Sequence, residues 1–175
     1  MTAETRREIA SWIKVVLGAM LTAFIISTFV IVHATVPTGS MMDTIPEKSR
    51  IIAFRLSYAF SDPERFDIVV FKYPDNEDLL YVKRIIGLPG ETIDIIDGKV
   101  YINGRSVPLD DPFIREAPVI SENYHYEVPK GHYFMMGDNR NNSEDSRFWK
   151  NTYLSRSKII GKMIFTYYPK FEFVK

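Results

Sequence analysis

Residues 92–102 read TIDIIDGKVYI, and this stretch is the strongest local indication of the fold. Two apolar, β-branched runs flank the pair Asp97-Gly98, and such a pair tolerates the positive φ angles of a two-residue hairpin turn. A second turn pair, Asn103-Gly104, follows at once. The stretch therefore predicts an antiparallel hairpin that ends in a further reversal of the chain.

The sequence on both sides of this hairpin continues the pattern of short strands. Runs rich in β-branched and aromatic residues recur between turn residues, at 50–54, 67–73, 79–86 and 162–168. All ten prolines lie at position 37 or later, which leaves no room for a long helix there. We therefore expect a mainly β fold, an antiparallel sheet domain over residues 37–175. Within it, the proline-punctuated residues 105–130 predict an excursion from the core strands or a small subdomain.

The first part of the chain has a different composition. From Val15 to Val32 no residue is charged, and the apolar character continues to residue 36. About twenty residues of α-helix cover roughly 30 Å, the thickness of the hydrocarbon core of a bilayer. Residues 15–36 are therefore predicted to form one transmembrane helix. A cleavable signal peptide ending near Ala34 is the alternative, although its apolar region would exceed the usual ~7–15 residues.

Basic residues indicate how this helix is oriented. Arg6, Arg7 and Lys14 lie on its N-terminal side, and loops rich in lysine and arginine stay in the cytoplasm. Residues 1–14 are therefore expected in the cytoplasm, and residues 37–175 outside it. The sequence predicts a single-pass protein of the cell membrane whose first partner is the lipid bilayer.

The bulk composition excludes several functions. Lys+Arg and Asp+Glu number 22 each, so no net charge attracts polyanions, and we expect no nucleic-acid partner. The chain has no cysteine, which excludes disulfides, a thiol nucleophile and a cysteine-based zinc site. Residues 137–147, GDNRNNSEDSR, begin like a calcium loop, but Arg140 falls on a ligand position and no glycine occupies the sharp turn. We therefore expect neither a metal nor a cofactor.

A candidate nucleophile follows the apolar segment directly, in the sequence Pro37-Thr38-Gly39-Ser40-Met41. A glycine before a serine permits a tight turn that exposes the hydroxyl and leaves the serine N–H free to face an oxyanion. Thr38 offers a second donor. On this pentapeptide alone, an ordinary turn between helix and strand remains open.

A serine hydroxyl needs a neighbouring base to become a nucleophile. Lys83 lies in residues 79–86, which read as a largely buried strand, and burial lowers the pKa of an ammonium group. The alternative is a lysine that protects an exposed edge strand. A triad of Ser40, His132 and Asp138 can also be written, but its spacing offers no support.

Four segments, taken in order, resemble the motifs of the type I signal peptidase family, the bacterial leader peptidases. They are PTGSMMDTI at 37–45, RFDIVVFKYP at 65–74, YVKRIIGLPGE at 81–91 and GDNRNNSEDSR at 137–147. One anchor, a short outer domain and the lack of cysteine look like the compact Gram-positive form. Asp43 departs from the first motif, where some members have proline, and we expect it to face solvent.

The resemblance implies a membrane-bound serine endopeptidase that removes signal peptides from exported preproteins. Ser40 would attack the scissile carbonyl, Lys83 would act as general base, and the Ser40 N–H with the Thr38 hydroxyl would form the oxyanion hole. The residues that orient and support the Lys83 amine would be Ser143, Asp145 and Arg147. Pockets for small substrate side chains would be lined by Val36, Pro37, Met41, Ile45, Tyr81 and Val82.

Two other functions stay open on the sequence. One is a self-cleaving serine-lysine protease of the SOS-repressor type, although those proteins carry a DNA-binding module where this chain has an apolar span. The other is a non-catalytic, membrane-tethered module that binds peptides.

Overall fold

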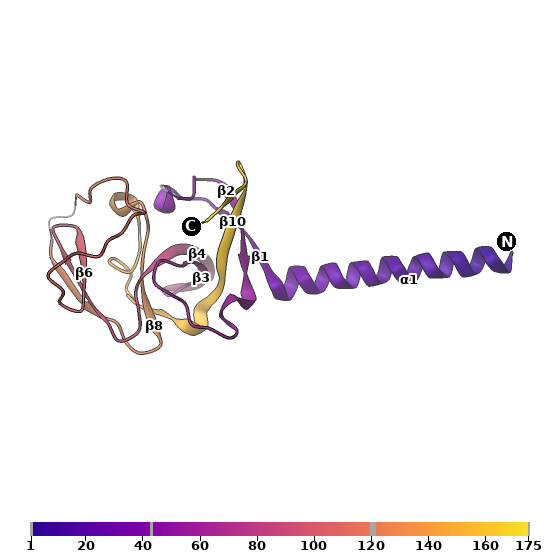
Figure 1. Cartoon of the computed structure of the whole chain (residues 1–175), viewed down its shortest axis with the longest axis horizontal. Coiled ribbons are helices and arrows are strands. Elements are labelled where there is room, and N and C mark those ends of the chain that lie inside the picture. Colours follow the sequence, from indigo (N-terminus) through magenta and orange to yellow (C-terminus); the bar gives the residue numbers. More distant parts are fainter. Residues whose placement is uncertain (1, 43, 120–121, 175) are drawn as a thin grey trace.

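The computed structural model describes residues 2–42, 44–119 and 122–174 of the 175-residue chain. Asp43, which we expect to face solvent, lies outside the described residues. The described part consists of one long helix that projects from a β-rich body, with the N-terminus at the far end of the helix (Figure 1).

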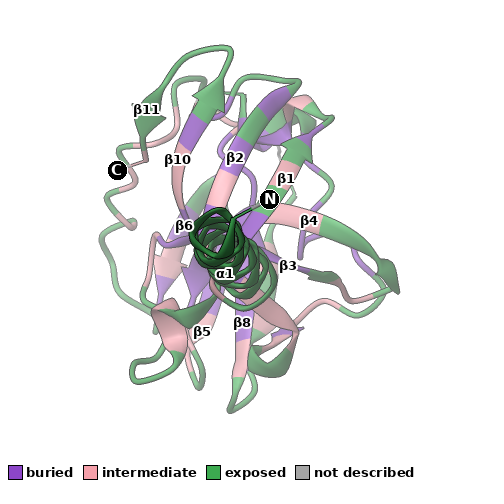
Figure 2. Cartoon of the chain, turned by 90° about the vertical axis from the view of Figure 1, so that its right-hand side faces the viewer, coloured by how far each residue is buried: buried purple, intermediate pink, exposed green. Residues whose placement is uncertain are grey.

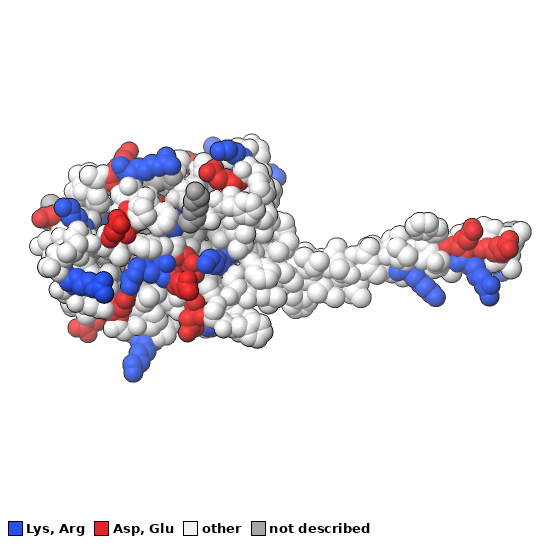
Figure 3. All heavy atoms as spheres, viewed as in Figure 1, with Lys and Arg blue, Asp and Glu red and all other residues white. Residues whose placement is uncertain are grey.

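The projecting element is helix α1, Ala3–Ile25, which a π-helical turn, Ile26–Val30, continues. None of its residues is buried. Charged side chains gather at its N-terminal end, and the stretch next to the body carries none on the face shown in Figure 3. Within the described residues, Ala3–Val30 is the one helix long and apolar enough to cross a membrane. An apolar helix with no protein packed around it is suited to lipid.

The sequence predicted a helix that continues to residue 36, but the helical part of the apolar segment ends at Val30. Ile31–Val36 form strand β1, which pairs antiparallel with strand β2, Ser49–Phe54. Val32 and Val36 point into the core and Ala34 packs against the same cluster, while His33 and Thr35 point outward, as a half-buried strand requires. The helix therefore ends at Val30, and the backbone enters the sheet without a linker.

The main sheet is antiparallel throughout, in the order β1-β2-β10-β3-β4-β8-β9, with β11 paired to β10. Its further strands are β3 (Ile68–Tyr73), β4 (Asn76–Gly87), β8 (His132–Met136), β9 (Leu154–Ser155), β10 (Ile159–Tyr168) and β11 (Glu172–Phe173). Looking along α1, β1, β2 and β10 lie side by side behind the exposed helix, with buried and exposed residues alternating along them (Figure 2). The prediction of a mainly antiparallel β fold after one N-terminal apolar helix is confirmed.

A second, three-stranded sheet has the order β6-β5-β7, from β5 (Thr92–Ile96), β6 (Lys99–Ile102) and β7 (Tyr124–Glu127). Its hairpin turn is the predicted one, because Asp97 and Gly98 adopt φ angles of 49° and 74°. Residues 105–119 of the predicted excursion contain no strand, and β7 returns the chain to this sheet.

Candidate active site

Three segments that are far apart in the sequence meet at one cleft. Ser40 lies in a 3-10 turn, Gly39–Met41, directly after β1, and Lys83 lies in β4. The third segment, residues 137–147, follows β8, which pairs with β4 beside Lys83. The backbone N–H of Asn139 donates to the carbonyl of Ser40 over 3.1 Å, and its side-chain amide donates to the carbonyl of Gly39 over 3.0 Å. These bonds fasten the serine turn to the third segment.

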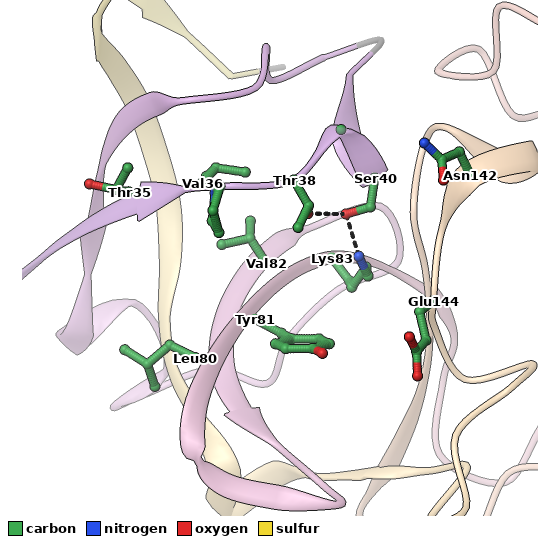
Figure 4. Close-up of a pocket in the computed structure, with 12 residues that line it drawn as sticks. Thr35, Val36, Thr38, Ser40, Leu80, Tyr81, Val82, Lys83, Asn142 and Glu144 are labelled. Atoms are coloured by element: carbon green, nitrogen blue, oxygen red, sulfur yellow. Dashed lines mark hydrogen bonds between the residues drawn. The ribbon is translucent and has the colours of Figure 1, made fainter.

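The side chains of Ser40 and Lys83 are in direct contact in this cleft. Lys83 Nζ donates a hydrogen bond to Ser40 Oγ (Figure 4). The two residues are only 6% and 4% exposed, respectively, so water has little access to either. Burial lowers the pKa of Lys83 to about 8, against the opposing effect of Asp145 and other nearby carboxylates. An amine with this pKa is partly neutral near neutral pH and can accept a hydroxyl proton.

Two hydrogen-bond donors lie beside the serine hydroxyl. Thr38 Oγ1 is 3.4 Å from Ser40 Oγ, and the threonine makes no capping bond to the turn that it precedes. The N–H of Ser40 belongs to the first residues of a 3-10 turn, whose own carbonyls cannot reach it. Both groups are therefore placed where they can bind a negative oxygen near Ser40.

Asp145 holds the third segment together next to the cleft residue Glu144. Its carboxylate is fully buried and accepts hydrogen bonds from Ser143 Oγ at 2.7 Å and from the Gly137 N–H at 3.0 Å. The guanidinium of Arg147 completes the set, with contacts of 2.8 and 2.9 Å. The structure thus brings the three predicted supporting residues together. Among the hydrogen bonds of the described residues, however, Ser143 donates to Asp145 and none joins it to Lys83.

Gly137 is a residue of this site that the sequence did not single out. A Cβ atom there would lie 2.3 Å from Ser143 Oγ and 2.4 Å from the carbonyl oxygen of Ser40. Both separations are shorter than real contacts of a Cβ atom, and the second involves backbone. The serine turn approaches the third segment this closely because position 137 has no side chain.

A buried ion pair connects the other face of β4 to the same segment. Arg84 follows Lys83 in the strand, so its side chain points away from the cleft. Its guanidinium holds both carboxylate oxygens of Asp138, at 2.8 and 2.7 Å, with the side chains 0% and 1% exposed. It also donates to the carbonyl of Phe66 at 2.7 Å. The pair fixes the start of residues 137–147 against β4, and the sequence did not predict it.

The alternative histidine triad is not assembled in the structure. His132 begins β8 and Asp138 follows its other end, so about six residues of extended chain, or roughly 20 Å, separate them. Asp138 is engaged by Arg84, and the Nδ1 atom of His132 lies 3.1 Å from the carbonyl oxygen of Lys130.

The cleft has a cavity volume of about 260 Å³. Four of the six residues predicted to contact substrate lie on its wall: Val36, Pro37, Tyr81 and Val82. Met41 and Ile45 do not, because both are fully buried in the core cluster beneath the serine turn. Within the described ranges, no group of three or more His, Asp or Glu side chains is placed to hold a metal ion.

The cleft lies between two strand edges. Residues 80–83 of β4 pair with β3 on one side, whereas β8 pairs with β4 only from Arg84 onward. Across the cleft, β1 pairs with β2 and has no second partner strand among the described residues. Both edges therefore leave backbone N–H and C=O groups that an extended peptide can bind.

Comparison with known proteins gives one consistent family. The family model described as signal peptidase, peptidase S26, matches residues 9–168. A probable signal peptidase I-2 of Synechocystis sp. is 38% identical over 164 residues, which cover 89% of this chain and 72% of that protein. Signal peptidase I S of Bacillus subtilis is 32% identical over 174 residues, covering 94% and 91% of the two chains. A crystal structure of a signal peptidase I from Enterococcus faecalis V583 aligns with a TM-score of 0.49 and 32% identity, over 58% of this chain and 97% of that one.

Proposed function

The chain belongs to the signal peptidase family, peptidase S26, and on that premise we propose that it cleaves signal peptides with Ser40 as nucleophile and Lys83 as general base. The family assigned from the four sequence motifs is confirmed by these matches, and with it the enzyme class. The observation that carries the residue assignment is the hydrogen bond between Lys83 Nζ and Ser40 Oγ inside a buried cleft.

The proposed reaction starts with the neutral amine of Lys83. It takes the proton of the Ser40 hydroxyl as Oγ attacks the scissile carbonyl, and the resulting oxyanion is bound by the Ser40 N–H and the Thr38 hydroxyl. The ammonium of Lys83 then protonates the leaving amine, and a water deprotonated by the same amine hydrolyses the acyl-enzyme. Asp145 lies near enough to stabilise the ammonium that forms between these steps.

We propose that the substrate, a preprotein with a signal peptide, binds in extended form between β1 and β4. The two strand edges supply backbone hydrogen bonds, and the residues before the cut lie against Val36, Pro37, Tyr81 and Val82. The family resemblance implies that the residues at the first and third positions before the cut have small side chains, and we expect the same here.

The proposed setting is a bilayer crossed once, with residues 1–14 in the cytoplasm and residues 37–175 outside. The basic residues near the N-terminus support this orientation. The short helix Arg55–Tyr58 touches the π-helical turn at the end of α1, and nearby Leu56 and Phe60 are exposed. Apolar side chains at the base of a membrane helix are suited to the interface with lipid.

Full-length chain in detergent, mixed with a preprotein, tests this function. We expect one cut between signal peptide and mature chain, confirmed by the N-terminal sequence of the product. A preprotein with phenylalanine directly before the cut should remain whole. Binding without cleavage would instead favour a peptide-binding module, and cleavage of the chain itself in place of the preprotein would favour a self-cleaving protease.

The pKa of Lys83 predicts how activity depends on pH. Because the neutral amine is the base and its pKa is about 8, kcat/KM should rise about tenfold per pH unit below that value and level off above it. Initial rates between pH 6 and pH 10 measure this profile. A rise centred near 6.5 that disappears in His132→Ala would contradict the assignment and point to a histidine base.

Gly137→Ala should lower kcat/KM at least about a hundredfold, because the added methyl group displaces the Ser40 carbonyl and Ser143 Oγ from their positions. The same preprotein assay measures the loss, and circular dichroism shows whether the sheet is retained. The matched control is Gly18→Ala in α1, where an added Cβ meets nothing within 4 Å. Equal activity of the two variants would show that the close approach at Gly137 does not matter.

A further inference from the structure

One charged side chain on the cleft wall has no part in the proposed reaction. Glu144 lies with Asn142 at the end of the cleft beyond Ser40 and Lys83, whereas Thr35 and Leu80 line the opposite end (Figure 4). Among the described residues that line the cleft, Glu144 and Lys83 alone carry a charge. The structure therefore places a negative charge at one end of a cleft whose other end carries no charge.

The carboxylate of Glu144 is exposed and has no bound partner among the described residues, either by hydrogen bond or by ion pair. The neighbouring acidic groups differ in this respect. Asp145 is held by Arg147 and Asp138 by Arg84. Asp75 accepts bonds from the Tyr73 hydroxyl and from two backbone N–H groups. Glu144 is thus the acidic side chain of this region that remains available to a ligand.

The negative charge of Glu144 affects the pKa values of side chains that line the cleft. Burial is the main reason why the pKa of Tyr81, a residue of the cleft wall, is raised, and the negative charge of Glu144 is the next largest contribution. The same charge opposes the lowering of the Lys83 pKa by burial. A substrate group bound next to Ser40 on this side would experience the same field.

The anchor determines which part of a substrate reaches that end. β1 runs from the membrane helix to Ser40, so Thr35 and Val36 lie on the membrane side of the nucleophile. A signal peptide has its apolar stretch in the bilayer, and the residues before the cut therefore approach along β1. The residues after the cut, which belong to the mature protein, then pass Asn142 and Glu144.

We infer that Glu144 selects among preproteins by the charge of the first residues after the cut, favouring lysine or arginine there and disfavouring aspartate or glutamate. The inference rests on the proposed function of Ser40 and Lys83 and deepens it by naming the preferred substrate class. The amino group that cleavage creates at the start of the mature chain lies at the same end and is attracted by the same carboxylate.

Three preproteins that differ only at the second position after the cut, with Lys, Gln or Glu there, test this inference. For the parent enzyme we expect kcat/KM to be roughly three- to tenfold higher for the Lys substrate than for the Glu substrate, as for an exposed charge pair. The ratio should approach one in Glu144→Gln and reverse in Glu144→Lys. Since both substrates meet the same enzyme, the ratio cancels any change in the Lys83 base.

The effect should lie mainly in KM, because the charge contact is equal in the bound substrate and in the transition state. It should also shrink in high salt. Glu64→Gln, a change at an exposed acidic residue that does not line the cleft, is the matched control and should leave the ratio unchanged. If the parent cuts all three substrates and Glu144→Gln does not move the ratio, the inference is wrong. If the parent cuts none, the proposed function fails as well.

Discussion

Ser40→Ala and Lys83→Ala are each expected to lower kcat for preprotein cleavage by at least about a thousandfold. The serine variant has no nucleophile. The lysine variant has no base within reach of Ser40 Oγ, since the other side chain bonded to this atom among the described residues is the hydroxyl of Thr38. Because the two side chains act as one unit, the double variant should be no slower than either single variant. Residual activity would come from the oxyanion donors and from substrate binding.

Lys83→Arg and Lys83→Met test whether the loss in Lys83→Ala comes from the missing base, from the missing positive charge or from lost packing. Arginine keeps the positive charge but does not lose its proton in proteins, and methionine keeps the volume and apolar contacts of the lysine stem. Both should be as inactive as Lys83→Ala if the amine is the base. Thermal unfolding of each variant shows whether the fold survives. A Lys83→Arg enzyme with near-parental activity would show that the charge alone is needed and would overturn the assignment.

Asp138→Ala is expected to reduce the free energy of unfolding by about 3–5 kcal/mol. The substitution leaves the guanidinium of Arg84, which is 0% exposed, without the carboxylate that holds two of its nitrogen atoms. Water cannot replace that partner at a fully buried site, so the charge remains uncompensated. Urea denaturation of the parent and the variant measures the difference.

An exposed ion pair provides the matched control. Asp62→Ala breaks the pair with Arg156, whose side chains are 79% and 45% exposed, and should cost less than about 1 kcal/mol. Replacing both buried partners, as in Arg84→Met with Asp138→Leu, should recover most of the lost stability, because no charge then remains buried. If Asp138→Ala is no more destabilising than Asp62→Ala, the buried pair does not stabilise the fold.

Much of the fold is readable from local sequence. The hairpin turn at Asp97-Gly98 and the strands β2, β3, β4 and β10 follow from turn chemistry and β-branched runs, which act over a few residues. The end of the membrane helix is not readable in this way. Residues 31–36 are apolar and β-branched, which suits a lipid-facing helix and a buried strand equally, and only the distant partner β2 decides between them.

In the candidate site too, local sequence predicts some residues, and contacts between distant segments determine the others. Ser40, Lys83 and the group around Asp145 lie in motifs that the sequence displays in order. Gly137 and Asn139 lie in the last of these motifs as well, but the sequence does not predict their roles, because these depend on how closely two remote segments approach. Met41 and Ile45 were expected on the cleft wall, but both side chains pack into the core cluster, and the Ile45 N–H donates to the Met41 carbonyl.

Strand β1 is at once the end of the anchor and the first strand of the catalytic body. A cut at Ala34 would remove Val32 from the core and half of the pairing with β2, so the body cannot release its anchor there and keep its sheet. Ser40 stands ten residues beyond Val30, at most about 35 Å of extended chain, and the pairing of β1 prevents that length from varying. The sheet itself, and not a flexible tether, therefore sets how far Ser40 lies from the end of the apolar helix.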